Sequence, residues 1–368
     1  MEKIFEKNFL TTKKNQNNVI ELCKNSKKNI VIMPAGQQAI YLVQYLKEHS
    51  INVEFFVDNN EKKHGTLIGG VPVISFTEYK KISDKKFLVV ATNEDVEKLL
   101  VNQLKDNNIE NYKCIIADYL GYSADEIDNA RELFINNFAE YFKLYGLLED
   151  DLSRKTLVNR LNYLITYDKS YIKEIISPSK NQYFEPEIYN ISSKDYFVDC
   201  GAFDGDTLDQ LMSNLDNKLA GYYGFEPDDA NYIKLSKKAA SFDNITIIKK
   251  GVYKNDAVLK FNGTNTSSSQ ISDDGNIKIE VTALDNALKD KKVSFIKMDI
   301  EGAEYDALSG AKNIIVNQKP TLAISVYHKF DDIYKLPFLI ESFGVKYKYY
   351  LRHYAMCSAE TVLYAIPQ

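Results

Sequence analysis

Two stretches of the chain alternate short apolar runs with segments of helical spacing, and this alternation limits the fold more than any other feature of the sequence. Alternating strands and helices are typical of a parallel sheet whose crossover connections are right-handed. We therefore predict an α/β fold with two sheets. The expected strands cover residues 29–33, 53–58, 86–91 and 112–116 in the first stretch, and 196–200, 221–225, 245–249, 294–298 and 321–326 in the second.

The end of the chain and the segment between the two stretches depart from this pattern. Residues 346–351 and 361–365 are separated by a short polar segment, which indicates a final antiparallel pair of strands. Between the stretches, Ser123 and Glu126 match a helix-capping box, and apolar residues then recur at helical spacing. We predict an N-terminal α/β domain in residues 1–120, a helical connector in 121–180 and a second α/β domain in 181–368.

Charge and composition exclude several classes of protein. The chain has 46 Lys and Arg against 51 Asp and Glu, a formal charge of −5, whereas a nucleic-acid-binding protein normally has a basic excess. No apolar run approaches the roughly 18–20 residues of a transmembrane helix. Residues 1–7 carry charges without an apolar run behind them, so we expect no secretory leader and a cytoplasmic location. The four cysteines form no CxxC pair, which predicts free thiols rather than a disulfide framework or a zinc site.

The segment 197–207, Phe-Val-Asp-Cys-Gly-Ala-Phe-Asp-Gly-Asp-Thr, joins a predicted strand to a predicted helix. Gly201 and Gly205 allow a tight turn and a close approach of the backbone to a ligand, because neither has a Cβ atom. In open α/β sheets ligands bind over the carboxyl ends of the strands. Glu226 follows the next strand, where its carboxylate can accept hydrogen bonds from both hydroxyls of a ribose.

The residue types of this loop discriminate between a dinucleotide and a nucleoside without phosphates. A dinucleotide site needs a second glycine where this chain has Phe203, and a pyrophosphate would be repelled by Asp199, Asp204 and Asp206. A cationic nucleoside without phosphates would be attracted. S-adenosylmethionine has a sulfonium, an ammonium and a ribose, and therefore fits. The alternative is a structural glycine turn without a ligand.

Three blocks in order, 199–207, 224–227 and 295–304 with its I-K-x-D-I-E-G-A-E pattern, resemble the FkbM family of S-adenosylmethionine-dependent methyltransferases. The resemblance covers roughly residues 182–365. It implies a class I methyltransferase fold, Rossmann-like, with a seven-stranded sheet whose last strand is antiparallel. It also implies methylation of a hydroxyl oxygen, often on a sugar or a natural-product scaffold. Residues 350–354 and 360–365 resemble family members from bacterial surface-carbohydrate loci.

The resemblance assigns roles to individual residues. The loop from Asp199 to Thr207 should hold the amino-acid end and the sulfonium side of the cofactor, Glu226 the ribose, and the segment around Gly251 the adenine. The full set assigned to S-adenosyl-L-methionine is Asp199, Gly201, Ala202, Phe203, Asp204, Gly205, Thr207, Glu226, Pro227, Gly251 and Val252.

A hydroxyl acceptor also needs a group that receives its proton. Asp299, Glu301 and His328 are the candidates, because all three follow strands and should lie at the carboxyl edge of the sheet. We predict no metal; the alternative is that these three residues hold a divalent cation. We interpret Glu304 as a charge that complements a helix N-terminus. We interpret Arg352 and His353 as a polar rim; the alternative is that they contact an anionic or sugar acceptor. Residues 264–269 form either a cover over the site or an ordinary loop.

The first α/β unit gives a weaker signal. Gly36, Asp58 and the segment 69–74 resemble the Rossmann-like N-terminal domain of nucleotide-sugar-linked acyltransferases. In that family a glycine loop and an acid recognise a nucleotide sugar. This chain lacks the fuller glycine loop, so we favour a docking or assembly domain over a nucleotide site.

The sequence thus predicts an O-methyltransferase that acts on a small-molecule or glycan acceptor, without a nucleic-acid partner or a transmembrane segment. Two other functions stay open at this point, a nicotinamide-dependent sugar oxidoreductase and a non-catalytic scaffold with a vestigial methyltransferase fold. Whether the chain forms a homo-oligomer is also open.

Overall fold

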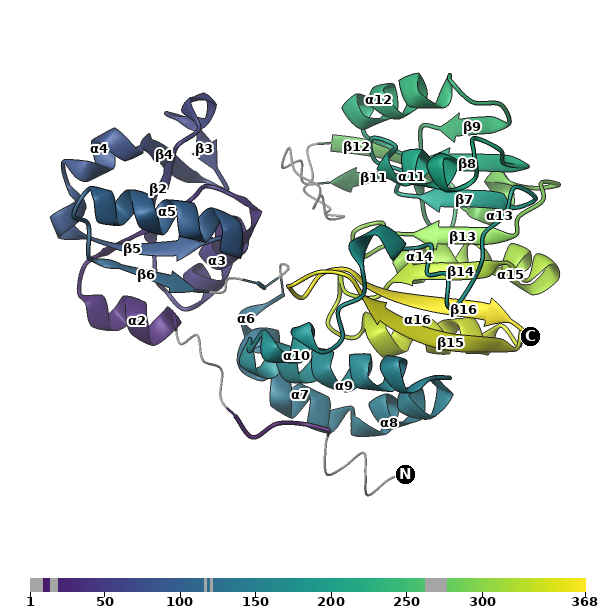
Figure 1. Cartoon of the computed structure of the whole chain (residues 1–368), viewed down its shortest axis with the longest axis horizontal. Helices are drawn as coiled ribbons and strands as arrows, with labels where there is room; N and C mark the ends of the chain where they lie inside the picture. The colour runs from purple at the N-terminus through teal and green to yellow at the C-terminus, as the bar shows by residue number, and fades with distance from the viewer. Residues whose placement is uncertain (1–8, 14–18, 116–117, 120–121, 262–276) are drawn as a thin grey trace. The chain divides into compact units, whose positions relative to one another are not determined.

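The computed structural model describes residues 9–13, 19–115, 118–119, 122–261 and 277–368, which form two compact units (Figure 1). One unit comprises residues 1–136 and 160–171, and the other comprises 137–159 and 172–368. Residues 1–7, on which the expectation about a leader rests, and the polar loop 264–269 lie outside the described residues. No helix of the described part of the chain combines the length and apolarity needed to cross a membrane.

The first unit is built on a six-stranded sheet in the order β3-β4-β2-β1-β5-β6. All neighbouring strands are parallel except β3 and β4. In β1 and β5 every residue after the first is buried, as expected for strands covered on both faces. The elements are α2 (Val19–Ser26), β1 (Asn29–Met33), α3 (Gln37–Glu48), β2 (Val53–Asp58), β3 (Leu67–Ile68), β4 (Val71–Ser75), α4 (Phe76–Lys80), β5 (Lys86–Ala91), α5 (Glu94–Asp106) and β6 (Tyr112–Ile115).

Helices occupy the segment where a helical connector is predicted. The capping box is present, since the Ser123 side chain accepts a hydrogen bond from the backbone N–H of Glu126 while the Glu126 carboxylate accepts from the backbone N–H of Ser123. α9 belongs to both units, because the boundary falls within it. The helices are α6 (Ala124–Asp128), α7 (Ala130–Asn136), α8 (Phe138–Leu147), α9 (Asp151–Thr166) and α10 (Ser170–Lys173).

The second unit contains a seven-stranded sheet in the order β15-β16-β14-β13-β7-β8-β9. Strands β14, β13, β7, β8 and β9 are parallel to one another. β16 is antiparallel to both of its neighbours, β14 and β15. This confirms the predicted seven-stranded sheet with an antiparallel last strand. The strands are β7 (Tyr196–Cys200), β8 (Gly221–Phe225), β9 (Ile245–Ile248), β13 (Phe295–Met298), β14 (Thr321–Ser325), β15 (Tyr347–His353) and β16 (Thr361–Pro367).

Helices and a small second sheet complete this unit. The small sheet has the order β10-β12-β11, and we did not predict β10 and β12 from the sequence. Its strands are β10 (Gly251–Val252), β11 (Ala257–Phe261) and β12 (Ile277–Thr282). The helices are α11 (Asp206–Asn214), α12 (Asp229–Ala239), α13 (Leu284–Ala287), α14 (Glu304–Ser309), α15 (Lys312–Gln318) and α16 (Asp332–Ser342).

The register of the parallel strands places four strand ends at one edge of the sheet. Cys200, the last residue of β7, lies opposite Phe225 of β8 and Met298 of β13. Met298 in turn lies opposite Ile324 of β14. The loops that leave these four strands therefore begin side by side, and they carry the predicted site residues.

Candidate functional site

The glycine loop after β7 turns back against the neighbouring strand ends. The backbone N–H groups of Gly201 and Ala202 both donate to the carbonyl oxygen of Phe225, at 3.1 and 3.0 Å. Gly201 has φ +80°, and a Cβ atom there would lie 2.0 Å from the backbone oxygen of Asp299. Only glycine fits, because both the backbone conformation and the close approach exclude a side chain.

We predict that Gly201→Ala destabilises the protein by at least about 2 kcal/mol, because it combines left-handed strain with a backbone clash. Denaturant unfolding measures the loss. Gly36→Ala is the matched control, since Gly36 has φ −117° and open space around the position of a Cβ atom. An equal stability change in the two variants would contradict the close approach.

Glu226 lies directly beside the glycine loop. Its Oε2 accepts the backbone N–H of Phe203 at 2.9 Å, and its Oε1 accepts that of Asp228 at 2.9 Å. The residue is 6% exposed, and burial raises the pKa of Glu226 to about 7 despite the two N–H donors, which lower it. The structure thus brings together the loop and the carboxylate that we assigned to opposite ends of one ligand.

The acids of the loop are partly neutralised by lysines. Asp199 is fully buried; Tyr222 donates its hydroxyl to Oδ2 at 2.7 Å, and the Lys297 ammonium lies 2.9 Å from Oδ1. Burial lowers the pKa of Lys297, but the charges of Asp199 and Asp299 outweigh this and raise it. Asp204 lies 3.8 Å from Lys238. Asp199 is therefore held from within the unit by Tyr222 and Lys297, and its assignment to the cofactor stays a prediction.

The other predicted cofactor residues lie around this loop. Ala202 is fully buried, whereas Phe203 is 44% exposed and has φ +46°, so its ring is presented at the loop surface. Thr207 is buried in the first turn of α11. Gly251 lies beside Pro227, since a Cβ atom on Gly251 would come within 3.8 Å of the proline ring, and Val252 is buried.

Asp299 follows β13 and is held by two tyrosines. Tyr183 donates its hydroxyl to Oδ2 at 2.8 Å, and Tyr327 donates to Oδ1 at 3.1 Å. Burial raises the pKa of Asp299, but the charges of His328 and Lys297 outweigh it, so the net pKa is lowered. The carboxylate is therefore ionised and fixed in orientation.

His328 and the two glutamates complete a cluster around Asp299. His328 Nε2 lies 3.4 Å from Oδ1 of Asp299 and 3.6 Å from Oε2 of Glu301, while its Nδ1 lies 2.9 Å from Oε1 of Glu304. Burial lowers the pKa of His328, but Glu304, Asp299 and Glu301 raise it to about 10. Partial burial raises the pKa of Glu301 to about 7, although His328 lowers it. The structure thus brings together all three predicted catalytic candidates.

Glu304 has more contacts than a helix N-terminal charge needs. It begins α14, and its Oε1 accepts the backbone N–H of Ile300 at 2.9 Å. Its side chain is fully buried. Glu304 therefore fixes both the turn after Asp299 and the ring of His328.

Our interpretation of Arg352 and His353 as a polar rim is wrong. Arg352 is 3% exposed and donates to both carboxylate oxygens of Asp150, at 3.2 and 2.7 Å. His353 is fully buried beside the Thr361 hydroxyl, 2.9 Å away. Both residues lie in β15, and their side chains are buried within the second unit.

Three residues of the site were missed by sequence reasoning: Tyr183, Lys297 and Tyr327. Lys297 donates to the backbone oxygen of Gly201 at 2.7 Å and lies over the ring of Tyr183 at 5.2 Å. It therefore connects β13 to the glycine loop. A lysine within an apolar strand is the signal that could have revealed it.

In the first unit, the carboxylate of Asp58 already has hydrogen-bond partners within the protein. It is 5% exposed and accepts the backbone N–H groups of Ala35 and Asn60, at 2.9 and 2.8 Å, and the Lys63 ammonium at 3.0 Å. The carboxylate thus closes the turn after β1. This contact pattern agrees with a structural role and leaves the nucleotide site a hypothesis.

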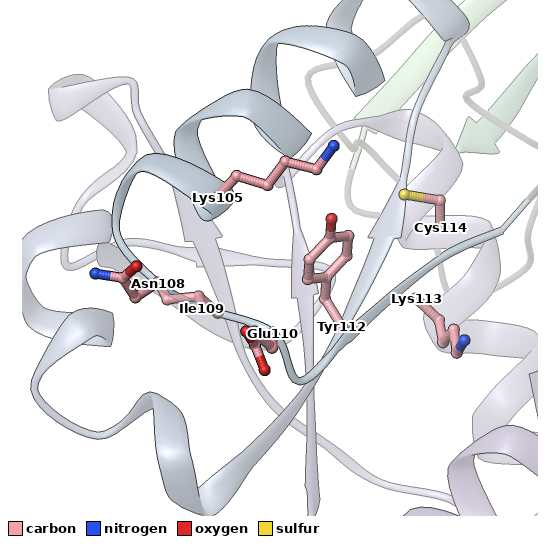
Figure 2. A pocket seen from close by; sticks show the side chains of 7 residues that line it. All are labelled: Lys105, Asn108, Ile109, Glu110, Tyr112, Lys113 and Cys114. Carbon is pink, nitrogen blue, oxygen red and sulfur yellow. The ribbon is translucent and has the colours of Figure 1, made fainter.

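A cavity of about 510 Å³ lies between the end of α5 and β6 (Figure 2). The Tyr112 side chain of β6 points toward the Lys105 side chain of α5. Neither Gly36 nor Asp58 lines this cavity. It is therefore separate from the loops that resemble a nucleotide-sugar site.

Comparison with known proteins gives two family matches. Residues 199–348 match the methyltransferase FkbM domain, and residues 3–117 match the C-methyltransferase C-terminal domain. A comparison with functionally curated proteins finds no match.

Two solved structures illustrate the similarity. The methyltransferase FkbM from Methylobacillus flagellatus KT is 25% identical, with 95% of this chain and 94% of that chain covered and a TM-score of 0.69. Aeropyrum pernix fibrillarin with natively bound S-adenosyl-L-methionine is 13% identical over 51% of this chain and 76% of that chain, with a TM-score of 0.34. The first similarity extends over both units, whereas the second covers about half of the chain.

Proposed function

We propose that this chain transfers the methyl group of S-adenosylmethionine to a hydroxyl oxygen of a sugar or glycan precursor, because residues 199–348 match the methyltransferase FkbM domain and a solved FkbM methyltransferase is similar over nearly the whole chain. The observation that carries the proposal is the hydrogen bond between the Phe203 N–H and Glu226, which joins the glycine loop to the ribose-binding carboxylate. Asp299 follows the neighbouring strand β13, and together with His328 beside it this carboxylate would face the acceptor hydroxyl.

The cofactor would lie over the ends of β7 and β8. Each oxygen of Glu226 accepts one backbone N–H and keeps a lone pair for a ribose hydroxyl. Gly201 and Gly205 let the loop approach the methionine part, and Pro227, Gly251 and Val252 border the adenine side. Phe203 offers an exposed ring beside the ligand.

Methyl transfer is an in-line displacement at the methyl carbon. The acceptor oxygen forms a bond to this carbon while the carbon–sulfur bond breaks, and its electron pair stays on sulfur to give S-adenosylhomocysteine. The hydroxyl proton leaves the acceptor and passes to a carboxylate of the cluster. The rate gain would come from holding oxygen, carbon and sulfur in line, at about 3 Å from oxygen to carbon.

The direct experiment incubates the full chain with S-adenosylmethionine and a panel of nucleotide sugars. The measurements are S-adenosylhomocysteine formation and the mass of the product. We expect a gain of one methylene unit on one class of acceptor, with the new methyl carbon bound to oxygen by NMR. NADH binding without S-adenosylmethionine binding would instead favour an oxidoreductase.

C-methylation is the second candidate, because residues 3–117 match a C-methyltransferase domain. In the same assay it would give a methyl carbon bound to carbon. That product would contradict the O-methyltransferase proposal while leaving the cofactor assignment intact. Cofactor binding without turnover across the panel would favour the scaffold function.

The resemblance of residues 350–354 and 360–365 to proteins of surface-carbohydrate loci supports an acceptor from bacterial surface-polysaccharide synthesis, with natural-product scaffolds as the alternative. The excess of acidic over basic residues supports a partner other than nucleic acid.

A further inference from the structure

We propose that Glu304 is a positioning residue of the methyl transfer, which holds the His328 imidazole as a cation with Nε2 directed toward the acceptor. His328 then donates a hydrogen bond to the acceptor, while the hydroxyl proton passes to a carboxylate. This inference rests on the proposed function. It gives Glu304 a role beyond that of a helix N-terminal charge, and it makes His328 a hydrogen-bond donor instead of a proton acceptor.

The two nitrogens of the His328 ring face different groups. Nδ1 lies 2.9 Å from Oε1 of Glu304, whereas Nε2 lies 3.4 Å from Oδ1 of Asp299 and 3.6 Å from Oε2 of Glu301. Charged groups that share a hydrogen bond lie about 2.7–2.9 Å apart, and the contact with Glu304 is the one in this range. Glu304 is therefore the main partner of the ring, and the proton on Nε2 is available to a ligand.

The burial of Glu304 requires a positive charge beside it. Its side chain is fully buried, and the backbone N–H of Ile300 donates to its Oε1 at 2.9 Å. Its Oε2 has no hydrogen-bond partner among the described residues, and Nδ1 of His328 is close to Oε1 but poorly aligned for a hydrogen bond. A buried carboxylate is costly unless a cation compensates its charge. The contact with His328 is therefore an ion pair with a charged ring.

Packing around His328 fixes the direction of the ring. Its side chain is 9% exposed, and its ring centroid lies 4.2 Å from that of Tyr327. On the backbone side, a Cβ atom on Gly302 would lie 3.7 Å from Cβ of His328. These contacts and the Glu304 ion pair leave Nε2 on the side of Asp299 and Glu301.

The charges around the ring are mostly negative. The carboxyl groups that act on His328, or whose own titration its charge affects, are Asp299 and Glu301 after β13, Glu304 of α14, Asp332 of α16 and Glu360 before β16. Burial and the charge of Glu304 raise the pKa of Asp332 to about 7. Among the cations, Lys297 acts on Asp299 and Glu360, and Lys329 acts on Asp332. The carboxylates next to the ring therefore favour its charged form.

A charged imidazole cannot accept the proton of the acceptor hydroxyl, so a carboxylate such as Asp299 must receive it. The acceptor oxygen forms its bond to the methyl carbon while the carbon–sulfur bond breaks, and the electron pair of that bond stays on sulfur. His328 keeps both ring protons throughout and donates Nε2–H to a second oxygen of the acceptor. Two neighbouring oxygens, as in a sugar diol, fit this pair of one carboxylate and one donor.

The test measures the charge of the ring and needs no acceptor. The chain contains four histidines, so histidine labelled with ¹³C at Cε1 gives few NMR signals. His328→Asn identifies the signal of His328, and NOEs to the ring of Tyr327 identify it independently. The full chain with S-adenosylhomocysteine is titrated with base. We expect native His328 to stay protonated at neutral pH and to titrate near its raised pKa of about 10. In Glu304→Gln the midpoint should lie at least about one pH unit lower.

Asp195→Asn is the matched control, because it removes another buried carboxylate of the same unit. Asp195 is 7% exposed and directly precedes β7, so it lies at the end of the strand opposite to the site. It should leave the midpoint of His328 unchanged. A native His328 that is neutral at neutral pH, or equal midpoints in folded Glu304→Gln and native protein, would overturn the inference. If Glu304→Gln fails to fold, the native titration decides alone.

Methyl transfer separates this inference from the proposed function. With an acceptor that is methylated, the rate of Glu304→Gln should fall in alkaline solution at a midpoint lowered by the same interval as that of the ring, because the rate depends on the charged His328. A rate that does not follow the ring charge would overturn the donor role. Absence of product with every acceptor would overturn the proposed function, whereas a neutral His328 would overturn the present inference alone.

Discussion

Replacing Glu226 with glutamine should abolish the rise in melting temperature that S-adenosylhomocysteine produces in the native protein. A ligand at 100 times its Kd stabilises the native state by about 2.7 kcal/mol, so the lost shift is readily measured. The reason is that Glu226 lies beside the glycine loop with one lone pair on each oxygen left for the ribose.

Asp151→Asn is the control for this experiment, because it removes an exposed carboxylate from the same unit. It should keep the full thermal shift. A Glu226→Gln protein that folds and still shows the native shift would show that the ribose lies elsewhere.

The Glu226→Gln substitution should also change how the stability of the protein depends on pH. The pKa of Glu226 rises from 4.5 to about 7 on folding, so the folded state binds more protons between these values. Its contribution to stability is therefore largest below pH 4.5 and is lost as the pH rises through 7. At about 1.4 kcal/mol per pKa unit, the unfolding free energy of native protein minus that of Glu226→Gln should fall by roughly 3 kcal/mol from pH 4.5 to pH 8.

Asp299→Asn should lower methyl transfer at saturating S-adenosylmethionine by about 100-fold or more, the range expected for removal of a group that assists proton transfer. The substitution removes the charge between Tyr183 and Tyr327 while keeping the size of the side chain. The measurement is the rate of S-adenosylhomocysteine formation.

Tyr183→Phe provides the graded comparison. It removes the hydroxyl that donates to Asp299 but keeps the ring under Lys297, so we expect a smaller loss of rate. Both variants should retain cofactor binding. An Asp299→Asn enzyme with more than a tenth of the native rate would contradict the role of this carboxylate.

Most strands of the main sheets were predictable because they are buried runs with a clear sequence signal, but β4 was not predicted. β3, β10 and β11 are short or lie outside the main parallel order, and their signal is correspondingly weak. β12, in contrast, alternates Ile277, Ile279 and Val281 with polar residues. This period-two pattern is typical of a half-buried strand, so β12 could have been predicted although we did not predict it.

For the site, the sequence predicted residues that lie within motifs at strand ends. Glu226 and His328 were placed correctly relative to their strands because the loops follow buried runs directly. Tyr183 could not be found this way: it contacts Asp299 from 116 positions away in the chain, in a segment without a motif. The partners of Arg352 and His353 were likewise set by tertiary packing rather than by local pattern.

Calorimetric titration of the native chain with S-adenosylhomocysteine provides the most direct test of the central claim, that β7 and β8 end in a single cofactor site. We predict saturable binding of one molecule per chain, competed by S-adenosylmethionine and absent in Glu226→Gln. Heat of binding from NADH but none from either sulfur nucleoside would contradict the claim.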